Sequence, residues 1–586
     1  MTSPVASWLS AFSQALAAQD HATATALFVP DGYWRDLLAL TWTIQTSEGP
    51  DQIAALLAAT VPVQQPRNLT PDGDDGWFTF ETTAGPALGR VTLRGGKCHT
   101  LFTCLQDLKG HEEPKGPRRP LGLTHRADPD RQTWSELRAT EVARIGAPDQ
   151  PYALIIGGGQ GGLALGARLR ALGVPFLIVE KNPRAGDSWR NRYRSLVLHD
   201  PVWYDHMPYL PFPDTWPVFT PKDKMGDWLQ AYASVFELNL WTRSTVTQAT
   251  HDPGAGRWTV TVDRDGQPVT LHPAQLVFAT GAYGPPRPVD FPGSDSFAGP
   301  LLHSSAYADG RQYAGKRCVV IGAASSAHDV AVDLWEAGAE VTMVQRTPTT
   351  VVRSETLMEL GFEIYSEAAL AKGISVEKAD LISASLPYGL FAAGQKTLYD
   401  TIRARDAAFY DRLAASGFAL DFGEDDSGQT MKALRTASGY YIDVGASDLI
   451  ASGQISVVSG DPVAEITPGA VRLHSGRDLP ADVIIACTGY QSMNEAVAGI
   501  VSRQVADAVG PCWGLGSGVR GDPGPWQGEL RNMWKPTAQD GLWFHGGNLA
   551  LSRFYSRVVA LQIKARFEGI PTPVYRQTAP RTKAMT

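Results

Sequence analysis

The segment of residues 153–182, ALIIGGGQGGLALGARLRALGVPFLIVEKN, constrains the fold of this chain more than any other segment. An apolar run leads into glycines in GxGxxG spacing, then a stretch with helical periodicity, then a second apolar run that ends at an acid. Gly157 permits a tight turn, Gly159 lets a pyrophosphate approach the backbone, and Gly162 lets helix and strand pack closely. The segment predicts a Rossmann-like unit that binds a dinucleotide at the start of its helix.

The acid at the end of this unit indicates which dinucleotide it binds. Glu180 lies 23 residues after Gly157, where a carboxylate can accept hydrogen bonds from both hydroxyl groups of a ribose. Lys181 follows it and is a second candidate for contact with the cofactor. We therefore expect a dinucleotide with free ribose hydroxyls here, and FAD is the economical assignment.

A related arrangement returns in the segment RCVVIGAASSAHDVAVDLWEAGAEVTMVQR, residues 317–346. Gly322 keeps the place of the first glycine, whereas Ala324 and Ala327 stand where the second and third glycines would be. The cofactor-binding candidates in this turn are Gly322, Ser325 and Ser326. The chain is thus predicted to hold two dinucleotide-binding units.

The second unit lacks the acid of the first. Counting 23 residues from Gly322 reaches Gln345, which is followed by Arg346 and Thr347. A carboxylate would repel a ribose 2′-phosphate, whereas an arginine beside a neutral side chain can bind one. NADPH is therefore favoured over NADH for this site, with a solvated surface arginine as the alternative interpretation of Arg346.

Two further strands end in Thr-Gly, within LVFATGAYGPP at 276–286 and DVIIACTGYQS at 482–492. Gly281 and Gly489 would let the chain cross between two nucleotide domains close to the ligand, or they are ordinary turn glycines. Both are included among the cofactor-binding candidates.

The segment FAGPLLHSSAY places Phe297, Gly299, His303 and Tyr307 in an FxGxxxHxxxY pattern between the two units. This pattern, the GDSWRNRY segment with Trp189 and the CTGY segment resemble class B flavin-dependent monooxygenases over residues 152–565. The resemblance implies that NADPH reduces FAD, that oxygen forms a flavin (hydro)peroxide, and that one oxygen atom passes to a ketone or to a soft N or S atom. For His303, a structural role and a catalytic role both remain open.

Residues 1–108 combine a helical start, a Trp-rich middle and short alternating runs, which is an α+β pattern. The following LKGHEEPKGPRRPLG is rich in Gly, Pro and charge and predicts an extended connector. This arrangement resembles type II flavin-containing monooxygenases, in which a SnoaL-like domain precedes the flavin domain and Baeyer–Villiger activity occurs. Packing, gating and formation of a homodimer are the roles open to this domain.

The expected fold is an α/β flavoprotein with Rossmann-like FAD and NADPH domains and an amino-terminal α+β domain of cone-like form. The expected boundaries are 1–108 for the SnoaL-like domain, 109–150 for a linker, 151–290 for the first part of the FAD domain, 291–465 for the NADPH domain with a helical insertion, and 466–586 for the second part of the FAD domain.

The candidate catalytic residues are His199 and Asp200, in an aromatic- and proline-rich stretch at 196–223 that we expect over the flavin ring. The resembled family carries an Asn in this neighbourhood, and His199 takes that place here. An imidazolium or a protonated acid could donate a hydrogen bond to the peroxide, but a carboxylate would repel it. A structural role for both residues is the alternative.

The segment GLWFHGGNLALSRFYSRVVALQIKA at 541–565 ends a strand and opens a helix, where the resembled family closes its flavin site. Asn548, Ser552 and Arg553 are candidate contacts with the flavin, and amphipathic packing is the alternative.

Charge and composition exclude several other classes of protein. The net charge of −8 with dispersed basic residues disfavours a nucleic-acid partner, and no apolar run is long enough for a membrane span. We expect a cytoplasmic protein without a metal site. The five cysteines include no CxxC pair, which disfavours a flavin disulfide reductase. An NADPH oxidase that releases hydrogen peroxide remains an alternative, as does a nucleotide-sensing protein that is not an enzyme.

Overall fold

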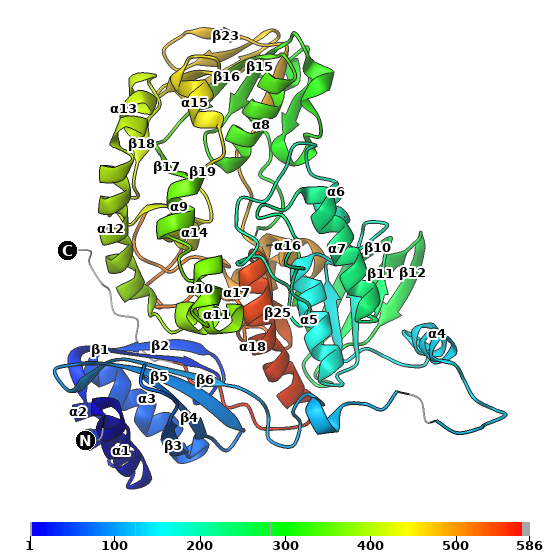
Figure 1. Cartoon of the computed structure of the whole chain (residues 1–586). Helices are drawn as coiled ribbons and strands as arrows, with labels where there is room; N and C mark the ends of the chain where they lie inside the picture. Colours follow the sequence, from blue (N-terminus) through cyan, green and yellow to red (C-terminus); the bar gives the residue numbers. More distant parts are fainter. Residues whose placement is uncertain (1–2, 123–124, 282, 577–586) are drawn as a thin grey trace.

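The computed structural model describes residues 3–122, 125–281 and 283–576, so the last ten residues of the predicted FAD domain lie outside the described residues. Figure 1 shows an amino-terminal unit at one end of the molecule and two Rossmann-like units above it. The predicted α/β fold with two dinucleotide-binding units and an amino-terminal α+β unit is confirmed.

The amino-terminal unit is a six-stranded sheet in the order β2-β1-β6-β5-β4-β3, with helices on one face. Trp8 and Phe12 of the first helix stack on each other, and Phe12 packs edge-on against Trp34 of the first strand. The other face of the sheet points toward the rest of the chain (Figure 1). Its elements are α1 (Pro4–Ala17), α2 (His21–Ala26), β1 (Phe28–Leu37), β2 (Ile44–Glu48), α3 (Gly49–Gln64), β3 (Arg67–Pro71), β4 (Trp77–Glu81), β5 (Pro86–Arg94) and β6 (Lys97–Leu105).

The connector that follows contains η1 (Gly116–Arg118) and α4 (Trp134–Arg144), and it extends outward from the body in Figure 1. Thr133 and Glu136 form a capping box at the start of α4. Arg138 of α4 binds the side chain of Asn239 at 2.6 Å, which fixes the helix to the first Rossmann-like unit.

The first Rossmann-like unit has a parallel sheet in the order β25-β13-β7-β8-β9, and β25 comes from the end of the chain. A three-stranded antiparallel sheet, β10-β11-β12, is inserted before β13. The elements of this unit are β7 (Ala153–Ile156), α5 (Gln160–Ala171), β8 (Phe176–Val179), α6 (Asp187–Arg190), α7 (Lys222–Val235), β9 (Leu240–Trp241), β10 (Ser244–Asp252), β11 (Arg257–Arg264), β12 (Gln267–Leu271), β13 (Gln275–Phe278), α16 (Asn494–Ile500), α17 (Arg503–Val509), β25 (Leu542–Phe544) and α18 (Leu549–Phe567).

The second Rossmann-like unit has a parallel sheet in the order β14-β24-β15-β16-β20. Two smaller sheets, β18-β17-β19 and β21-β22-β23, flank it. Its elements are η2 (Ser294–Ser296), β14 (Leu301–His303), η3 (Ser304–Ala306), η4 (Gly310–Tyr313), β15 (Arg317–Ile321), α8 (Ser325–Glu336), β16 (Glu340–Gln345), β17 (Thr349–Arg353), β18 (Leu420–Asp421), α14 (Gly428–Thr436), β19 (Tyr440–Asp443), α15 (Ala446–Ala451), β20 (Ser456–Ser459), β21 (Val463–Thr467), β22 (Ala470–Leu473), β23 (Asp478–Pro480) and β24 (Val483–Ala486).

A helical insertion separates β17 from β18. It consists of α9 (Ser354–Leu360), α10 (Glu367–Ala371), α11 (Val376–Ala384), α12 (Tyr388–Arg405) and α13 (Ala407–Ala415). Figure 1 shows α10 and α11 above the amino-terminal sheet and beside α18, whereas α12 and α13 run up the side of the molecule. The insertion thus brings residues of the second unit next to the first.

Among the described residues, no helix has both the length and the apolar character that a membrane span requires. The same part of the chain contains no group of His, Cys, Asp and Glu side chains arranged to hold a metal ion.

Candidate functional site

The turn between β7 and α5 leaves space beside Gly159. Its backbone is extended, with φ −78° and ψ −172°, and no side chain caps the helix that begins after it. A Cβ added to Gly159 would meet only the Ser188 hydroxyl, at 3.5 Å, whereas one added to Gly162 would lie 1.9 Å from the Gly157 carbonyl oxygen. Gly157 itself has φ +111°, which only glycine adopts easily. Gly157 and Gly162 therefore serve the turn and its packing, and Gly159 borders the open side.

Glu180 is buried directly behind this turn. One carboxylate oxygen accepts a hydrogen bond from the amide of Gly158 at 2.7 Å, and the other accepts from the amide of Asn182 at 2.8 Å. The second oxygen also accepts from the Asn182 side-chain amide at 2.6 Å. These bonds hold the carboxylate at the carboxyl end of β8, and the oxygen that faces Gly158 keeps a further lone pair for a ligand hydroxyl. Lys181 next to it is exposed.

Three segments meet around the start of α5. Trp189 of α6 donates from its indole nitrogen to the Gln160 side-chain oxygen at 3.2 Å, and the Gln160 amide donates to the Gly547 carbonyl at 3.2 Å. Gly161 lies next to Gly546, and an added Cβ would be in ordinary van der Waals contact with the Gly546 Cα at 3.5 Å. The amino termini of α5 and α18 therefore face the same region of the first unit.

The second turn has the same geometry with different residues. Gly322 has φ +132°, and a Cβ there would lie 2.6 Å from the Cys487 carbonyl oxygen. Ala324 precedes α8, which has no side-chain cap. The Ser325 hydroxyl donates to the Tyr440 carbonyl at 2.9 Å, and Ser326 beside it is half-buried. This turn again leaves the start of a helix without a capping side chain.

Gln345 and Arg346 have different surroundings although they are adjacent. Gln345 is fully buried: its amide nitrogen donates to the Ala419 carbonyl at 2.8 Å, and its oxygen accepts from the Ala419 amide and the Ser459 hydroxyl. Arg346 and Thr347 are exposed, and Arg346 makes no ion pair or side-chain hydrogen bond with any other residue that the structure describes. Arg346 is therefore free to bind an anion, whereas Gln345 joins β16 to the neighbouring segments.

We expect Gln345→Glu to lower the free energy of unfolding by about 1–3 kcal/mol, the cost of leaving a buried polar group unpaired. A glutamate would place a carboxylate oxygen next to the Ala419 carbonyl oxygen. In the native protein that carbonyl accepts a hydrogen bond from the Gln345 side-chain amide. Urea unfolding of the variant measures the loss. The exposed Gln454→Glu in the same unit is the control, and equal stability of the two variants would contradict the structural role of Gln345.

The two connections between the Rossmann-like units run side by side. Gly284 donates to the Gln491 carbonyl at 2.8 Å, and Tyr283 stacks on Tyr490 with ring centroids 5.3 Å apart. Gly281 and Gly489 both have positive φ and open space around them. The glycines at the strand ends thus lie where the chain crosses between the units.

His303 holds one of these connections. The Ser305 amide donates to its Nδ1 at 3.1 Å, so Nε2 carries the proton and donates to the Gly489 carbonyl at 3.0 Å. Tyr307 of the same motif donates to the Asp333 carboxylate at 2.6 Å. In this structure both residues make structural contacts within the described part of the chain.

A polar cluster forms where α18 begins. Asn548 caps this helix by accepting from the Leu551 amide at 3.0 Å. Its amide nitrogen lies 3.2 Å from the Tyr204 hydroxyl and 3.5 Å from the Asp200 carboxylate, and His199 Nε2 lies 4.0 Å from Asp200. The structure thus brings together the predicted residues His199, Asp200 and Asn548, which are far apart in the sequence.

Burial changes the protonation of this cluster. It raises the pKa of Asp200, although the nearby His199 acts in the opposite direction. The carboxyl of Asp205 has a pKa well above its usual range, because it is buried and lies near Asp200. Burial also lowers the pKa of His545, at the end of β25, to about 3, so this imidazole is neutral at pH 7. The cluster therefore favours neutral forms of its acids.

We expect Asp200→Asn to stabilise the protein at neutral pH by about 1–3 kcal/mol, the scale of a buried group that lacks full compensation. The folded-state pKa of Asp200 lies above its unfolded value of 3.8, so its ionisation favours the unfolded state. The gain should therefore vanish below pH 3.8 and grow as the pH rises through the folded-state pKa. Melting temperatures from pH 3 to pH 8 measure it, with the exposed Asp214→Asn of the same loop as control.

The other two candidate flavin contacts of α18, Ser552 and Arg553, have different surroundings. Arg553 directs its guanidinium to the Asp380 carboxylate and to the carbonyls of Tyr204 and His206. The Ser552 hydroxyl is buried and has no hydrogen-bond partner among the described residues. Each nitrogen of the Arg553 guanidinium thus already has a partner within the protein.

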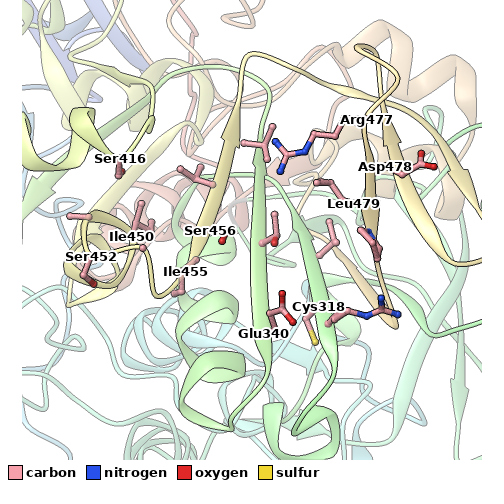
Figure 2. A pocket seen from close by; sticks show the side chains of 18 residues that line it. Cys318, Glu340, Ser416, Ile450, Ser452, Ile455, Ser456, Arg477, Asp478 and Leu479 are labelled. Carbon is pink, nitrogen blue, oxygen red and sulfur yellow. The ribbon is translucent and has the colours of Figure 1, made fainter.

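A cavity of about 680 Å³ lies elsewhere, at the amino ends of β15, β16 and β20, as Figure 2 shows. Its labelled lining residues include Cys318, Glu340, Ser456 and Arg477 (Figure 2). Gly322 lies at the opposite, carboxyl end of β15. Ligands of open α/β sheets bind at the carboxyl ends of the strands, so this cavity is separate from the candidate site.

Sequence reasoning missed several residues of the polar cluster, notably Tyr204, Asp205 and Asp380. The first two lie in the aromatic-rich stretch that we singled out, so their neighbourhood was identified but their roles were not. No local signal marks Asp380, because its partner Arg553 is 173 residues away.

Comparisons with known proteins agree with this architecture. A family model described as pyridine nucleotide-disulphide oxidoreductase matches residues 154–384. Among curated proteins, indole-3-pyruvate monooxygenase YUCCA1 of Oryza sativa subsp. japonica is 34% identical over 344 residues, which cover 58% of this chain and 77% of the relative. Probable indole-3-pyruvate monooxygenase YUCCA3 of Arabidopsis thaliana is 31% identical and is covered over 73% of its length, again against 58% of this chain.

Solved structures show the same fold at low sequence identity. A crystal structure of cyclohexanone monooxygenase with bound ε-caprolactone has a TM-score of 0.51 and 18% identity, with 71% of this chain and 88% of that chain covered. The complex of OTEMO with FAD and NADP has a TM-score of 0.50 and 20% identity, with 72% and 86% covered. All five cysteines of this chain are free. From its identity to the rice enzyme over three quarters of that enzyme's length, this chain belongs to the flavin-dependent monooxygenase family and is an enzyme of that class.

Proposed function

We propose that this protein is a monooxygenase that uses FAD, NADPH and molecular oxygen to insert one oxygen atom into a ketone or to oxygenate a soft N or S atom. The observation that carries the proposal is the pair of strand–turn–helix units, each with an uncapped helix start, joined by two adjacent connections. Uncapped helix starts with open space in front of them suit the pyrophosphates of two dinucleotides.

In the first unit, the residues present fit FAD. The open space at Gly159 admits a pyrophosphate, and Glu180 is held where it can accept from ribose hydroxyls. Trp189 and the start of α18 at Asn548 border the region where the flavin ring would lie. When bound, FAD supplies the redox chemistry, in that it takes a hydride from the nicotinamide and passes electrons to oxygen.

In the second unit, we assign the coenzyme to the turn formed by Gly322, Ser325 and Ser326. The exposed and unpaired guanidinium of Arg346 with Thr347 beside it suits a ribose 2′-phosphate, which favours NADPH. NADH lacks this phosphate and would bind through the remaining contacts, so it is the second coenzyme to test.

The buried cluster at Asn548 would serve the reaction by holding a proton. Because burial raises the pKa of Asp200, its carboxyl oxygen retains a proton to higher pH than an exposed acid would. A protonated carboxyl in this place offers a hydrogen-bond donor to an oxygen atom on which negative charge develops, and the Asn548 amide orients it. The neighbouring aromatic side chains would exclude water from the same place.

For the substrate, we favour carbonyl compounds over amines and sulfides. Two of the similar curated proteins are named for indole-3-pyruvate, which carries a ketone group. The amino-terminal extension further supports a placement among type II flavin-containing monooxygenases, with Baeyer–Villiger activity. The SnoaL-like nature of that extension and a homodimer remain predictions.

The deciding experiment supplies the purified enzyme with NADPH and ¹⁸O₂ together with ketones, sulfides or amines. Mass spectrometry of the products and the hydrogen peroxide formed per NADPH are measured together. One ¹⁸O atom per product molecule is the expected result. Consumption of NADPH with hydrogen peroxide as the sole oxygen product, for every compound tried, would instead establish the alternative function of an NADPH oxidase.

A further inference from the structure

A buried ion pair connects the helical insertion of the second unit to α18, next to the loop that carries Asp200. Arg553 of α18 and Asp380 of α11 are 4% and 7% exposed. The guanidinium donates to both carboxylate oxygens, from Nε at 2.8 Å and from Nη2 at 2.7 Å. Such a two-point contact fixes the plane of the guanidinium as well as its position.

The third guanidinium nitrogen of Arg553 faces the backbone. Its Nη1 donates to the carbonyl of Tyr204 at 2.7 Å and to the carbonyl of His206 at 2.9 Å. Both carbonyls belong to the segment that follows Asp200 along the chain. Arg553 therefore links the carboxylate of Asp380 to the backbone of the loop that carries a candidate catalytic side chain.

The same loop also contacts the insertion directly. Tyr204 packs against Phe362 and Tyr365 with ring centroids 5.1 Å and 4.8 Å apart, and the Tyr365 hydroxyl donates to Asp380 at 3.0 Å. Trp203 donates to Glu367 of α10 at 3.0 Å. The segment 203–206 thus rests on the insertion, and Asp380 lies at the centre of these contacts.

Helix α11 is in turn held by the amino-terminal sheet. Arg35 of β1 donates to the Ala384 carbonyl at 2.6 Å, and Arg90 of β5 donates to the Ser385 hydroxyl at 3.1 Å. The ammonium of Lys378 lies 4.1 Å from the ring centroid of Trp77. Figure 1 shows α11 directly above this sheet and beside α18, so the amino-terminal unit supports the helix that carries Asp380.

We propose that Asp380 and Arg553 form a positioning pair, which fixes the 203–206 segment and thereby the distance of Asp200 and Tyr204 from Asn548. The inference rests on the proposed function, because it concerns the same reaction site. Both residues act through the loop and are not catalytic residues. Loss of the pair would let the loop move, admit water and divert reducing equivalents to hydrogen peroxide.

The pair can be removed without leaving a lone buried charge. In the double variant Asp380→Leu/Arg553→Met both charges are replaced by apolar side chains of similar size, a change that often costs little stability. The exposed pair of Arg405 and Glu359, 2.7 Å apart in the same insertion, gives the matched control Glu359→Leu/Arg405→Met. If the buried double variant does not fold, Arg553→Lys keeps the charge and removes the two-point contact.

Hydrogen–deuterium exchange of the full-length, FAD-loaded protein is the first measurement. The amides of Tyr204 and Asp205, which donate to the Pro201 carbonyl, and of Phe212, which donates to His206, report on the loop. We expect their exchange to become about tenfold faster, the equivalent of one lost hydrogen bond, with little change elsewhere. Unchanged exchange in this segment, or faster exchange throughout the core, would overturn the proposal.

The hydrogen peroxide released per NADPH is the second measurement, and we expect it to rise severalfold in the buried variants only. A wild-type enzyme that releases peroxide alone would defeat the proposed function, yet the exchange experiment would still test the positioning pair. If the wild-type enzyme oxygenates its substrate but the buried variants keep the wild-type loop exchange and peroxide yield, the positioning pair is wrong and the proposed function stands.

Discussion

Gly159→Val is expected to abolish FAD binding and to leave the protein folded. The backbone of Gly159 is in a region that valine adopts readily, and the nearest atom to an added Cβ is the Ser188 hydroxyl, 3.5 Å away. The side chain would instead fill the space at the start of α5 that a pyrophosphate needs. We expect the FAD content per chain to fall more than about tenfold, since a displaced pyrophosphate loses several charge-assisted hydrogen bonds.

The FAD content is measured from the flavin absorbance of the purified protein, and circular dichroism checks the fold. Gly394→Val, in the middle of α12, is the matched control, because a Cβ there meets nothing within 4 Å and no ligand is assigned to that helix. A Gly159→Val protein with one FAD per chain would show that the first turn does not bind the pyrophosphate.

Arg346→Ala is expected to raise the KM for NADPH by about 10- to 100-fold, as expected for the loss of a charge-assisted hydrogen bond to phosphate. The KM for NADH should hardly change, because NADH has no 2′-phosphate. The structure strengthens this expectation, since Arg346 is exposed and has no competing partner among the described residues. Steady-state kinetics with both coenzymes measures the difference.

The matched control is Arg477→Ala. Arg477 is an exposed arginine of the same unit. It lines the cavity at the amino ends of the strands, whereas Arg346 follows the carboxyl end of β16 (Figure 2). The control removes the same charge and should leave both KM values unchanged. Equal losses with NADPH and NADH in Arg346→Ala would mean that this residue acts through folding or nicotinamide placement.

Glu180 and Gln345 show how far a sequence pattern is sufficient to predict the surroundings of a residue. Spacing predicts Gln345 as the counterpart of Glu180, and both residues lie at the carboxyl end of the strand that follows a glycine turn and a helix. Spacing does not reveal that Gln345 is saturated by Ala419 and Ser459, because those partners come from segments 74 and 114 residues away. A change to glutamate therefore affects stability before it affects the choice of coenzyme.

The reaction site illustrates the same limit. The aromatic-rich stretch and the helix start at Asn548 could be predicted from composition and from the strand–turn–helix pattern. The proximity of Asp200 to Asn548 could be expected only from the resemblance to a family. The buried pair of Asp380 and Arg553 had no signal at all, since a charged residue on a helix is usually solvated.

What the sequence by itself determined is local: the strand, glycine turn and helix of each unit, whose periodicity and backbone requirements involve neighbouring residues. What only the tertiary structure decided is which distant side chains share a buried environment. Burial removes water as a competing partner, so it sets the protonation of Asp200 and the pairing of Arg553 with Asp380. These properties depend on three separate parts of the chain meeting at the start of α18, and no single segment encodes them.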